Sequence, residues 1–257
     1  MTTTMTGIEA AEAEGILTLR INRPDKKNAL TPAMYEGLTA GLRRADQDQG
    51  IRAVIITGGD ACFTAGNDLQ DFLQTPPLGE ESPVMQFLLT ISETRTPIVA
   101  AVNGVAVGVG TTMLLHCDLV VAAEDALFQM PFVNLGLCAE AASTLLMPQL
   151  MGQRRAAELL LLGERFSPRQ GVAVGLVNRV VPAYEVATVA RQLAVALAAQ
   201  PPDALQLTKR LLKAANSSAV RETILAEGRH FAELLRRPEA KEALSAFLEH
   251  RPPDFSR

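Results

Sequence analysis

The sequence has few cysteines, few aromatic residues and no tryptophan. Aromatic residues make up 4% of the 257 residues, and the chain contains three cysteines. Cys62, Cys117 and Cys138 share no CxxC or metal-ligand spacing, so we expect reduced, buried thiols in a reducing compartment. The core must then be built mainly from leucine, valine and alanine, which agrees with a hydrophobic content of 48%.

Long runs of one charge and long apolar runs are also absent. The formal net charge is only −4, and no basic cluster suggests a nucleic-acid partner. The apolar runs fall short of the roughly 20 residues that a membrane span needs. The first residues, MTTTMTG, lack the basic region and apolar core of a signal peptide. We therefore expect a cytoplasmic protein without a membrane or nucleic-acid partner.

The three histidines are isolated in the sequence. His116 lies in an apolar segment, where a hydrogen-bonded core histidine is the expected role. Neither His230 nor His250 has a spacing that suggests metal ligands, and no Ser-His-Asp set can be argued. We expect no metal site.

The apolar pattern predicts an α/β core followed by a helical tail. Strands and helices are expected to alternate up to residue 116, and one more strand follows. After Glu140 the pattern becomes helical, interrupted by one extended piece, and a boundary near Pro201-Pro202 separates a core (1–200) from a tail (201–257). The expected strands are 16–21, 52–57, 98–102, 119–121 and 176–181; the expected helices are 31–46, 84–93, 141–151, 153–162, 167–175, 184–199, 202–215, 219–235 and 238–248.

The centre of the chain carries glycines at close spacing. Gly104, Gly108 and Gly110 follow the strand at 98–102 and are expected to open a helix. Such glycines allow close backbone approach, and N–H groups at a helix start favour an anion. From the residues alone, two interpretations stay open, a tightly packed buried helix or an anion-binding turn.

Two further segments resemble ordinary turns when each is taken alone. The loop NRPDKKNAL carries Lys26 and Lys27, which could meet phosphate or could simply be solvated. In FTAGNDL, Gly66 permits an unusual backbone angle, so a peptide N–H near Asn67 could point into a pocket. The Pro- and Gly-rich segment 73–83 is expected to be a mobile loop over the site.

Together these segments resemble the enoyl-CoA hydratase/isomerase family, also called the crotonase family. The matching motifs are NRPDKKNAL, FTAGNDL, AAVNGVAVGVG with the following Cys117-Asp118, PFVNLGL, and SAFLEHR in the tail. They cover nearly the whole chain in the family's order. The resemblance implies a spiral of β-β-α units with a C-terminal helical trimerisation region, so a homotrimer or homohexamer is expected.

The resemblance also implies an acyl-CoA thioester substrate whose carbonyl oxygen gains negative charge. Two backbone N–H groups stabilise that oxygen in the family, and matching the motifs assigns these to Asn67 and Val109. No separate cofactor is expected, because coenzyme A is part of the substrate.

The acids distinguish the reactions within the family. The two glutamates of the hydratases fall on Thr112 and Phe132, so both are absent. Glu140 stands where the peroxisomal-type Δ3,Δ2-enoyl-CoA isomerases carry their single catalytic glutamate, although Ala141-Ala142 replaces a more usual glycine. One carboxylate can move a proton from C2 to C4 as base and then acid.

The resemblance assigns coenzyme A to the NRPDKKNAL loop, FTAGNDL and the tail of a neighbouring subunit. Phe247 is expected near the adenine, and His250 falls where the family often has a lysine. The expected substrate-binding residues are Lys26, Lys27, Ala65, Gly66, Asp68, Leu69, Gly108, Thr112, Phe132, Leu135 and Phe247.

The leading hypothesis is therefore an enoyl-CoA isomerase that uses Glu140. An enoyl-CoA hydratase, or another crotonase reaction that uses Glu140 differently, is the second hypothesis. A non-catalytic acyl-CoA-binding scaffold on the same fold is the third.

Overall fold

The computed structural model describes residues 2–5, 7–69, 71, 79–249 and 251–256. At its centre is a seven-stranded sheet with the order β1-β2-β3-β4-β5-β7-β9. The strands from β3 onward run parallel, and β1 and β2 extend the sheet in antiparallel fashion. The strands are β1 (Thr2–Met5), β2 (Ile8–Ala13), β3 (Ile16–Ile21), β4 (Ala53–Thr57), β5 (Ile98–Val102), β7 (Leu119–Ala123) and β9 (Arg179–Val181).

The strands expected at 16–21, 52–57, 98–102 and 119–121 are confirmed. β2 is an addition to them, because its sequence IEAAEA consists mostly of alanine and glutamate, which are uncommon in strands, and the strand forms by pairing along the full length of β3. The extended piece expected at 176–181 is shorter than predicted and begins at Arg179, where pairing with β7 begins.

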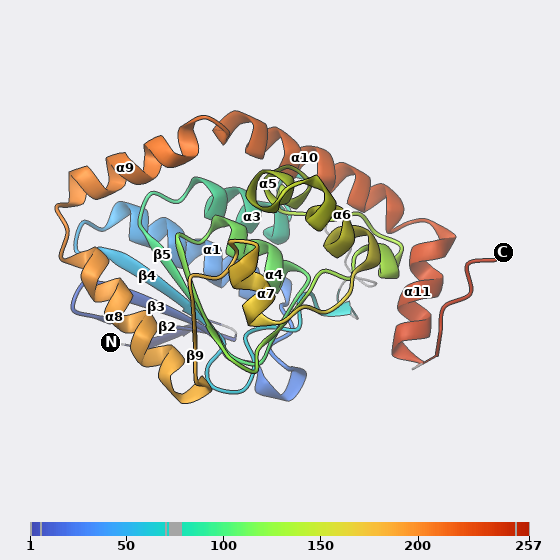
Figure 1. Cartoon of the computed structure of the whole chain (residues 1–257), viewed down its shortest axis with the longest axis horizontal. Coiled ribbons are helices and arrows are strands. Elements are labelled where there is room, and N and C mark those ends of the chain that lie inside the picture. The colour runs from blue at the N-terminus through green and yellow to red at the C-terminus, as the bar shows by residue number, and fades with distance from the viewer. Residues whose placement is uncertain (1, 6, 70, 72–78, 250, 257) are drawn as a thin grey trace.

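Helices cover the sheet from two sides. α8 (Val186–Ala198) packs against β4, β5 and β7, whereas α1 (Pro32–Gln47) packs against β3 and against α3 (Pro83–Glu93). Figure 1 shows the strands between α8 and the pair α1 and α3. The start of α1 follows the expected rule, since the Thr31 side chain accepts the N–H of Met34 and proline occupies the first turn.

A small second sheet stands beside the main one. β6 (Val105–Val107) pairs in parallel with β8 (Leu127–Gln129), and α4 (Val109–Thr112) and the 3-10 helix η2 (Met113–His116) follow β6 directly. The expected direct passage from Gly104 into a helix is therefore corrected. The segment is extended because it also pairs with Thr64, whose N–H donates to Val105 and whose carbonyl accepts from Val107.

The second half of the chain is mostly helical, as expected. An η3 turn (Val133–Leu135) precedes Glu140, and several helices besides α8 follow it. These helices are α5 (Ser143–Met151), α6 (Gln153–Leu162), α7 (Pro168–Ala173), α9 (Pro202–Ala214), α10 (Ser217–Leu234) and α11 (Pro238–Leu248). The expected α/β fold, with β-β-α units and a helical C-terminal region, is confirmed.

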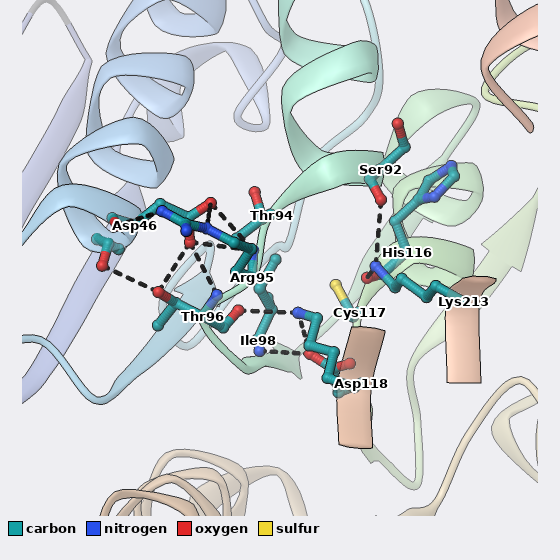
Figure 2. A network of polar contacts seen from close by, with 12 residues as sticks. Asp46, Ser92, Thr94, Arg95, Thr96, Ile98, His116, Cys117, Asp118 and Lys213 are labelled. Atoms are coloured by element: carbon teal, nitrogen blue, oxygen red, sulfur yellow. Dashed lines mark hydrogen bonds and ion pairs between the residues drawn. The ribbon is translucent and has the colours of Figure 1, made fainter. Parts of the chain in front are cut away.

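A buried lysine, Lys209, and a partly buried one, Lys213, attach α9 to the core. Lys209 Nζ donates to Asp118 Oδ2 at 2.6 Å, and Lys213 Nζ donates to the carbonyls of Ser92 at 3.4 Å and His116 at 3.3 Å. Figure 2 shows Lys213 beside Ser92 and His116. Burial lowers the pKa of Lys213 to about 8. The tail is therefore part of the core's polar network.

The apolar side chains of the tail differ in burial. Phe231, Leu235 and Leu244 are buried, whereas α9 leaves a row of leucines open to solvent. Within the described residues, the exposed leucines of α9 are Leu207, Leu211 and Leu212. Most of the loop expected at 73–83 lies outside the described residues, and Ser82 at its end caps α3.

Candidate active site

Two glycine turns meet backbone to backbone beside the small sheet. Gly66 has a φ of 92°, and a Cβ built on it would lie 2.8 Å from the carbonyl oxygen of Val107. Gly108 has φ 57° and ψ −120°, backbone angles that residues other than glycine rarely adopt, and it forms the N-cap of α4. Both glycines are therefore required by geometry, and they bring the two turns into contact.

The residues after these glycines are Asn67 and Val109. The peptide groups on both sides of Asn67 face Leu30, because Leu30 N–H donates to Gly66 and Asp68 N–H donates to Leu30. The N–H of Asn67 itself therefore points away from Leu30. Val109 is the first residue of α4, where an N–H has no acceptor within the helix. In the described part of the chain, neither N–H donates to a protein acceptor.

This pair of N–H groups has the chemistry of an oxyanion site. Two preorganised backbone donors near the start of a helix stabilise negative charge on an oxygen without reorganising. The anion-binding interpretation of the glycine turn is therefore compatible with the geometry. The close-packing interpretation also holds in part, because a Cβ on Gly110 would lie 2.6 Å from Thr64 Cγ2.

Polar contacts hold the turn that carries Asn67. Thr64 Oγ1 accepts the N–H of Gly66 at 3.1 Å and donates to the carbonyl of Asn28 at 2.7 Å. Asp68 Oδ2 accepts from Arg23 Nη1 at 2.7 Å. Asp68 thus ties its turn to the NRPDKKNAL loop, and its expected contact with substrate stays a prediction.

Glu140 lies in an apolar pocket between α3 and α10. The residue is 5% exposed, and its Oε1 has no hydrogen-bond partner within the described chain. Burial, and secondarily the nearby Glu227, raise the pKa of Glu140 to about 8. The cavity beside it measures about 20 Å³ and is lined otherwise by Val84, Met85, Leu88, Ile224, Gly228 and Phe231.

A carboxyl group in this setting is a candidate general acid or base. A buried side-chain oxygen without a partner is costly, and perturbed acids of this kind concentrate at functional sites. A pKa near neutral pH also suits a group that must both take and give a proton. The Glu140 carboxyl group can therefore transfer a proton within an apolar pocket.

Tyr35 is a site residue that sequence reasoning missed. It is buried on α1, and its hydroxyl donates to Asn67 Oδ1. The negative charge of Glu140 contributes, after burial, to a raised pKa of the Tyr35 phenol. Tyr35 thus contacts the Asn67 turn and lies within electrostatic range of Glu140. Its helical spacing from other apolar residues predicts only a core position, so the sequence carried no signal for this role.

Glu227 was also missed, for the same reason. It lies on the buried face of α10, and its carboxylate contacts the turn that follows Glu140. His116, in contrast, is buried and hydrogen-bonded as expected, with Nε2 2.8 Å from the carbonyl of Ala141. Burial lowers the pKa of His116 to about 4, so the imidazole is neutral at pH 7.

The remaining expected residues fall into three groups, which are buried, exposed and partly buried. Phe132 is buried with its ring beside Gly108, and Thr112 is buried in α4 with a hydroxyl that has no partner among the described residues. Lys26 and Lys27 are exposed at the 3-10 helix η1 (Pro24–Lys26), and Phe247 is 59% exposed on α11. Ala65, Leu69 and Leu135 are partly buried, and His250 lies outside the described residues.

Neither a metal cluster nor a membrane-spanning helix is found in the part of the chain that the structure describes. Across the described residues, no group of three or more His, Cys, Asp and Glu side chains could hold a metal ion. The helices in the same part of the chain are too short or too polar to cross a membrane.

Comparison with known proteins gives a consistent family. The family model for enoyl-CoA hydratase/isomerase matches residues 11–257. The solved structure of Pseudomonas aeruginosa OdaA is 48% identical, with a TM-score of 0.93, and covers 95% of this chain and 99% of that one.

Two curated relatives carry different reaction names. The 2,3-dehydroadipyl-CoA hydratase of Escherichia coli is 33% identical over 98% of this chain and 99% of its own. The enoyl-CoA delta isomerase 2 of Rattus norvegicus is 35% identical over 80% of this chain and 54% of its own, so the match spans about half of that relative. With the fold and the paired glycine turns described above, these matches show that the chain belongs to the enoyl-CoA hydratase/isomerase family.

Proposed function

We propose that this acyl-CoA enzyme is a Δ3,Δ2-enoyl-CoA isomerase. The observation that supports this most is Glu140, a buried carboxyl group with an unpartnered oxygen in an apolar pocket. The positions of the two hydratase glutamates hold Thr112 and Phe132, neither of which can act as a general base near neutral pH.

The reaction needs one proton carrier. The Glu140 carboxylate removes a proton from C2 of the 3-enoyl thioester, and the electron pair spreads over a dienolate to the thioester oxygen. The N–H groups of Asn67 and Val109 stabilise that oxygen. Glu140 then returns the proton to C4, which leaves the 2-enoyl thioester and regenerates the carboxylate, so no water is consumed.

The apolar setting of Glu140 favours this chemistry over hydration. A carboxylate with a pKa of about 8 is a stronger base toward the weakly acidic C2–H than a solvated glutamate. At pH 7 roughly a tenth of such groups are ionised. The lining of the cavity beside Glu140 is otherwise apolar, so among the described residues it offers no second polar side chain to orient the attacking water that a hydratase must hold.

Coenzyme A binding and assembly belong to the same proposal. Lys26 and Lys27 are exposed on the loop next to FTAGNDL and are available to phosphate, and Phe247 is available to the adenine. The exposed leucines of α9 support a homotrimer or homohexamer, because they form an apolar face that a second subunit can cover. The cytoplasmic location stays a prediction from the sequence.

The test measures the conversion of 3-enoyl and 2-enoyl thioesters, side by side, by wild type and by the Glu140→Gln variant. Isomerisation of the 3-enoyl thioester should fall by at least about 10²–10⁴ in the variant, because one group acts in both proton transfers. Thioester binding should persist, since the N–H donors belong to the main chain.

The control is Thr112→Ala, which removes a hydroxyl and should leave most of the isomerase activity. If Glu140→Gln retains isomerase activity, the assignment of the base is refuted. If wild type hydrates 2-enoyl thioesters efficiently through Glu140 and isomerises poorly, the protein is a hydratase. If wild type binds both thioesters and converts neither, the scaffold hypothesis replaces the isomerase.

A further inference from the structure

The chain is strained directly after Glu140. Ala141 and Ala142 adopt left-handed backbone angles, with φ of 62° and 54°, and both are fully buried. A left-handed conformation is unfavourable for an L-residue with a side chain, whereas glycine adopts it freely. Such strain persists only where surrounding contacts enforce it, and it concentrates at functional sites.

One side of this turn is held by Glu227 of α10. Its Oε2 accepts the N–H of Ala142 at 2.6 Å, and its Oε1 accepts the N–H of Thr144 at 3.1 Å and the hydroxyl of Thr144 at 2.6 Å. Three donors on two oxygens match an ionised carboxylate, because a protonated one would bring a competing hydrogen.

Glu227 also completes the start of α5. This helix begins at Ser143, and its N-cap residue, Ala142, has no side-chain oxygen to accept the first free N–H groups. The Glu227 carboxylate supplies that cap from another helix, and its negative charge is favoured at the positive end of α5. The cap therefore couples α10 to the backbone that carries Glu140.

The other side of the turn is held by His116. A carbonyl oxygen only accepts, so Nε2 of the neutral imidazole donates to the carbonyl of Ala141. The carbonyl of His116 accepts in turn from Lys213 of α9. The peptide group between Ala141 and Ala142 is thus fixed at both ends by side chains of other elements, its carbonyl by His116 and its N–H by Glu227.

We propose, on the basis of the isomerase function above, that Glu227 is the positioning residue of the catalytic acid. By holding the strained turn it directs Glu140 into the apolar pocket, and its negative charge makes Glu140 a stronger base. Glu227 does not touch the reacting atoms, so it acts through Glu140.

The groups around Glu140 allow the effect of the Glu227 charge on the Glu140 pKa to be isolated. α3 contributes apolar side chains to the pocket, α1 contributes the phenol of Tyr35, and His116 is neutral. Among the described residues, Glu227 is the charged group that raises the pKa of Glu140 beside the effect of burial. Removing that charge should lower the pKa of Glu140, but burial should keep it above 4.5.

The main variant is Glu227→Gln. Its amide oxygen can still accept from Thr144, but its NH₂ group would face the N–H of Ala142, donor against donor. We expect the Glu140 pKa to fall, which moves the acid limb of the kcat/KM profile to lower pH. We also expect kcat at high pH to fall at least about tenfold, because a displaced base loses alignment with C2, with little change in thioester affinity.

Two variants separate charge from geometry. The double variant Glu227→Gln with Ala142→Gly relieves the left-handed strain, so it should regain most of the high-pH kcat while the Glu140 pKa stays lowered. Glu227→Asp keeps the charge on a shorter side chain and should lower kcat with little change in pKa. Glu222→Gln removes an exposed charge from the same helix and should change neither quantity.

A readout without turnover keeps this proposal separate from the isomerase assignment. The glutamate carboxyl carbons of the ligand-free protein can be titrated by ¹³C NMR, with Glu140→Gln and Glu227→Gln used to assign the two resonances, since coupled acids titrate as a pair. If wild type does not isomerise 3-enoyl thioesters, the proposed function fails and the titration still tests the coupling. The proposal is overturned if folded Glu227→Gln has an unchanged Glu140 pKa and a high-pH kcat within twofold of wild type. If circular dichroism shows that Glu227→Gln does not fold, an unchanged kcat in Glu227→Asp overturns the proposal.

Discussion

Replacing Glu140 by glutamine should change the pH dependence of stability in a defined way. The folded protein holds this carboxyl group protonated up to a pKa of about 8, whereas the ordinary pKa of a glutamate is 4.5. Between these two values the unfolded chain is ionised and the folded chain is not. Folding then takes up a proton, so the wild type loses stability as pH rises.

The size of the effect follows from the two pKa values. Each unit of pKa difference corresponds to about 1.4 kcal/mol, so Glu140 costs the fold about 3 kcal/mol at pH 7 and about 5 kcal/mol above pH 8. Glutamine removes the titration. Its own unpartnered amide costs about 1–3 kcal/mol, but that cost is the same at every pH. The free energy of unfolding of the variant relative to wild type should therefore rise by about 3 kcal/mol from pH 5 to pH 8.

The assay is urea unfolding of both proteins at pH 5, 6, 7 and 8, followed by circular dichroism. Protein concentration must be held constant, because self-association adds to apparent stability. Glu222→Gln is the matched control, since it removes an exposed carboxylate of α10 and should run parallel to wild type. Parallel curves for Glu140→Gln and wild type would refute the reasoning, because Glu140 would then ionise as a solvated glutamate does.

Four further results are expected. Gly108→Ala should abolish isomerase activity and lower the melting temperature, because the residue has φ 57° and ψ −120° at the start of α4; an active, stable variant would contradict the glycine requirement. Gly228→Ala should raise KM for branched or long acyl groups more than for short ones. The new Cβ would lie 2.7 Å from Met85 Sδ and would push that side chain into the pocket beside Glu140. Steady-state kinetics over a series of acyl chain lengths checks this. Replacing Lys26 and Lys27 by alanine should weaken coenzyme A binding in calorimetry and reduce its salt dependence; unchanged affinity would count against the phosphate contact. Light scattering should report a trimer or hexamer, and a monomer at micromolar concentration would contradict the assembly.

The local elements could be predicted because their causes lie within a few residues of sequence. Thr31-Pro32 specifies the start of α1, and the uniformly apolar runs at 53–57 and 98–102 specify buried parallel strands. The family motifs likewise lie in continuous segments, so Asn67, Val109 and Glu140 could be selected as candidates from the sequence.

Contacts between distant segments decided the rest. β6 is extended because Thr64 pairs with it, and the sequence of β6 alone is equally compatible with the glycine-rich helix that was expected. Tyr35 and Glu227 belong to the site only because α1 and α10 pack where they do, at 105 residues before and 87 residues after Glu140 along the chain. Their helical spacing specifies a buried face, but the polar atom that each meets there comes from another part of the chain. Burial of Glu140 itself, and with it the raised pKa, likewise results from the packing of α3 against α10 and cannot be predicted from its neighbours in sequence.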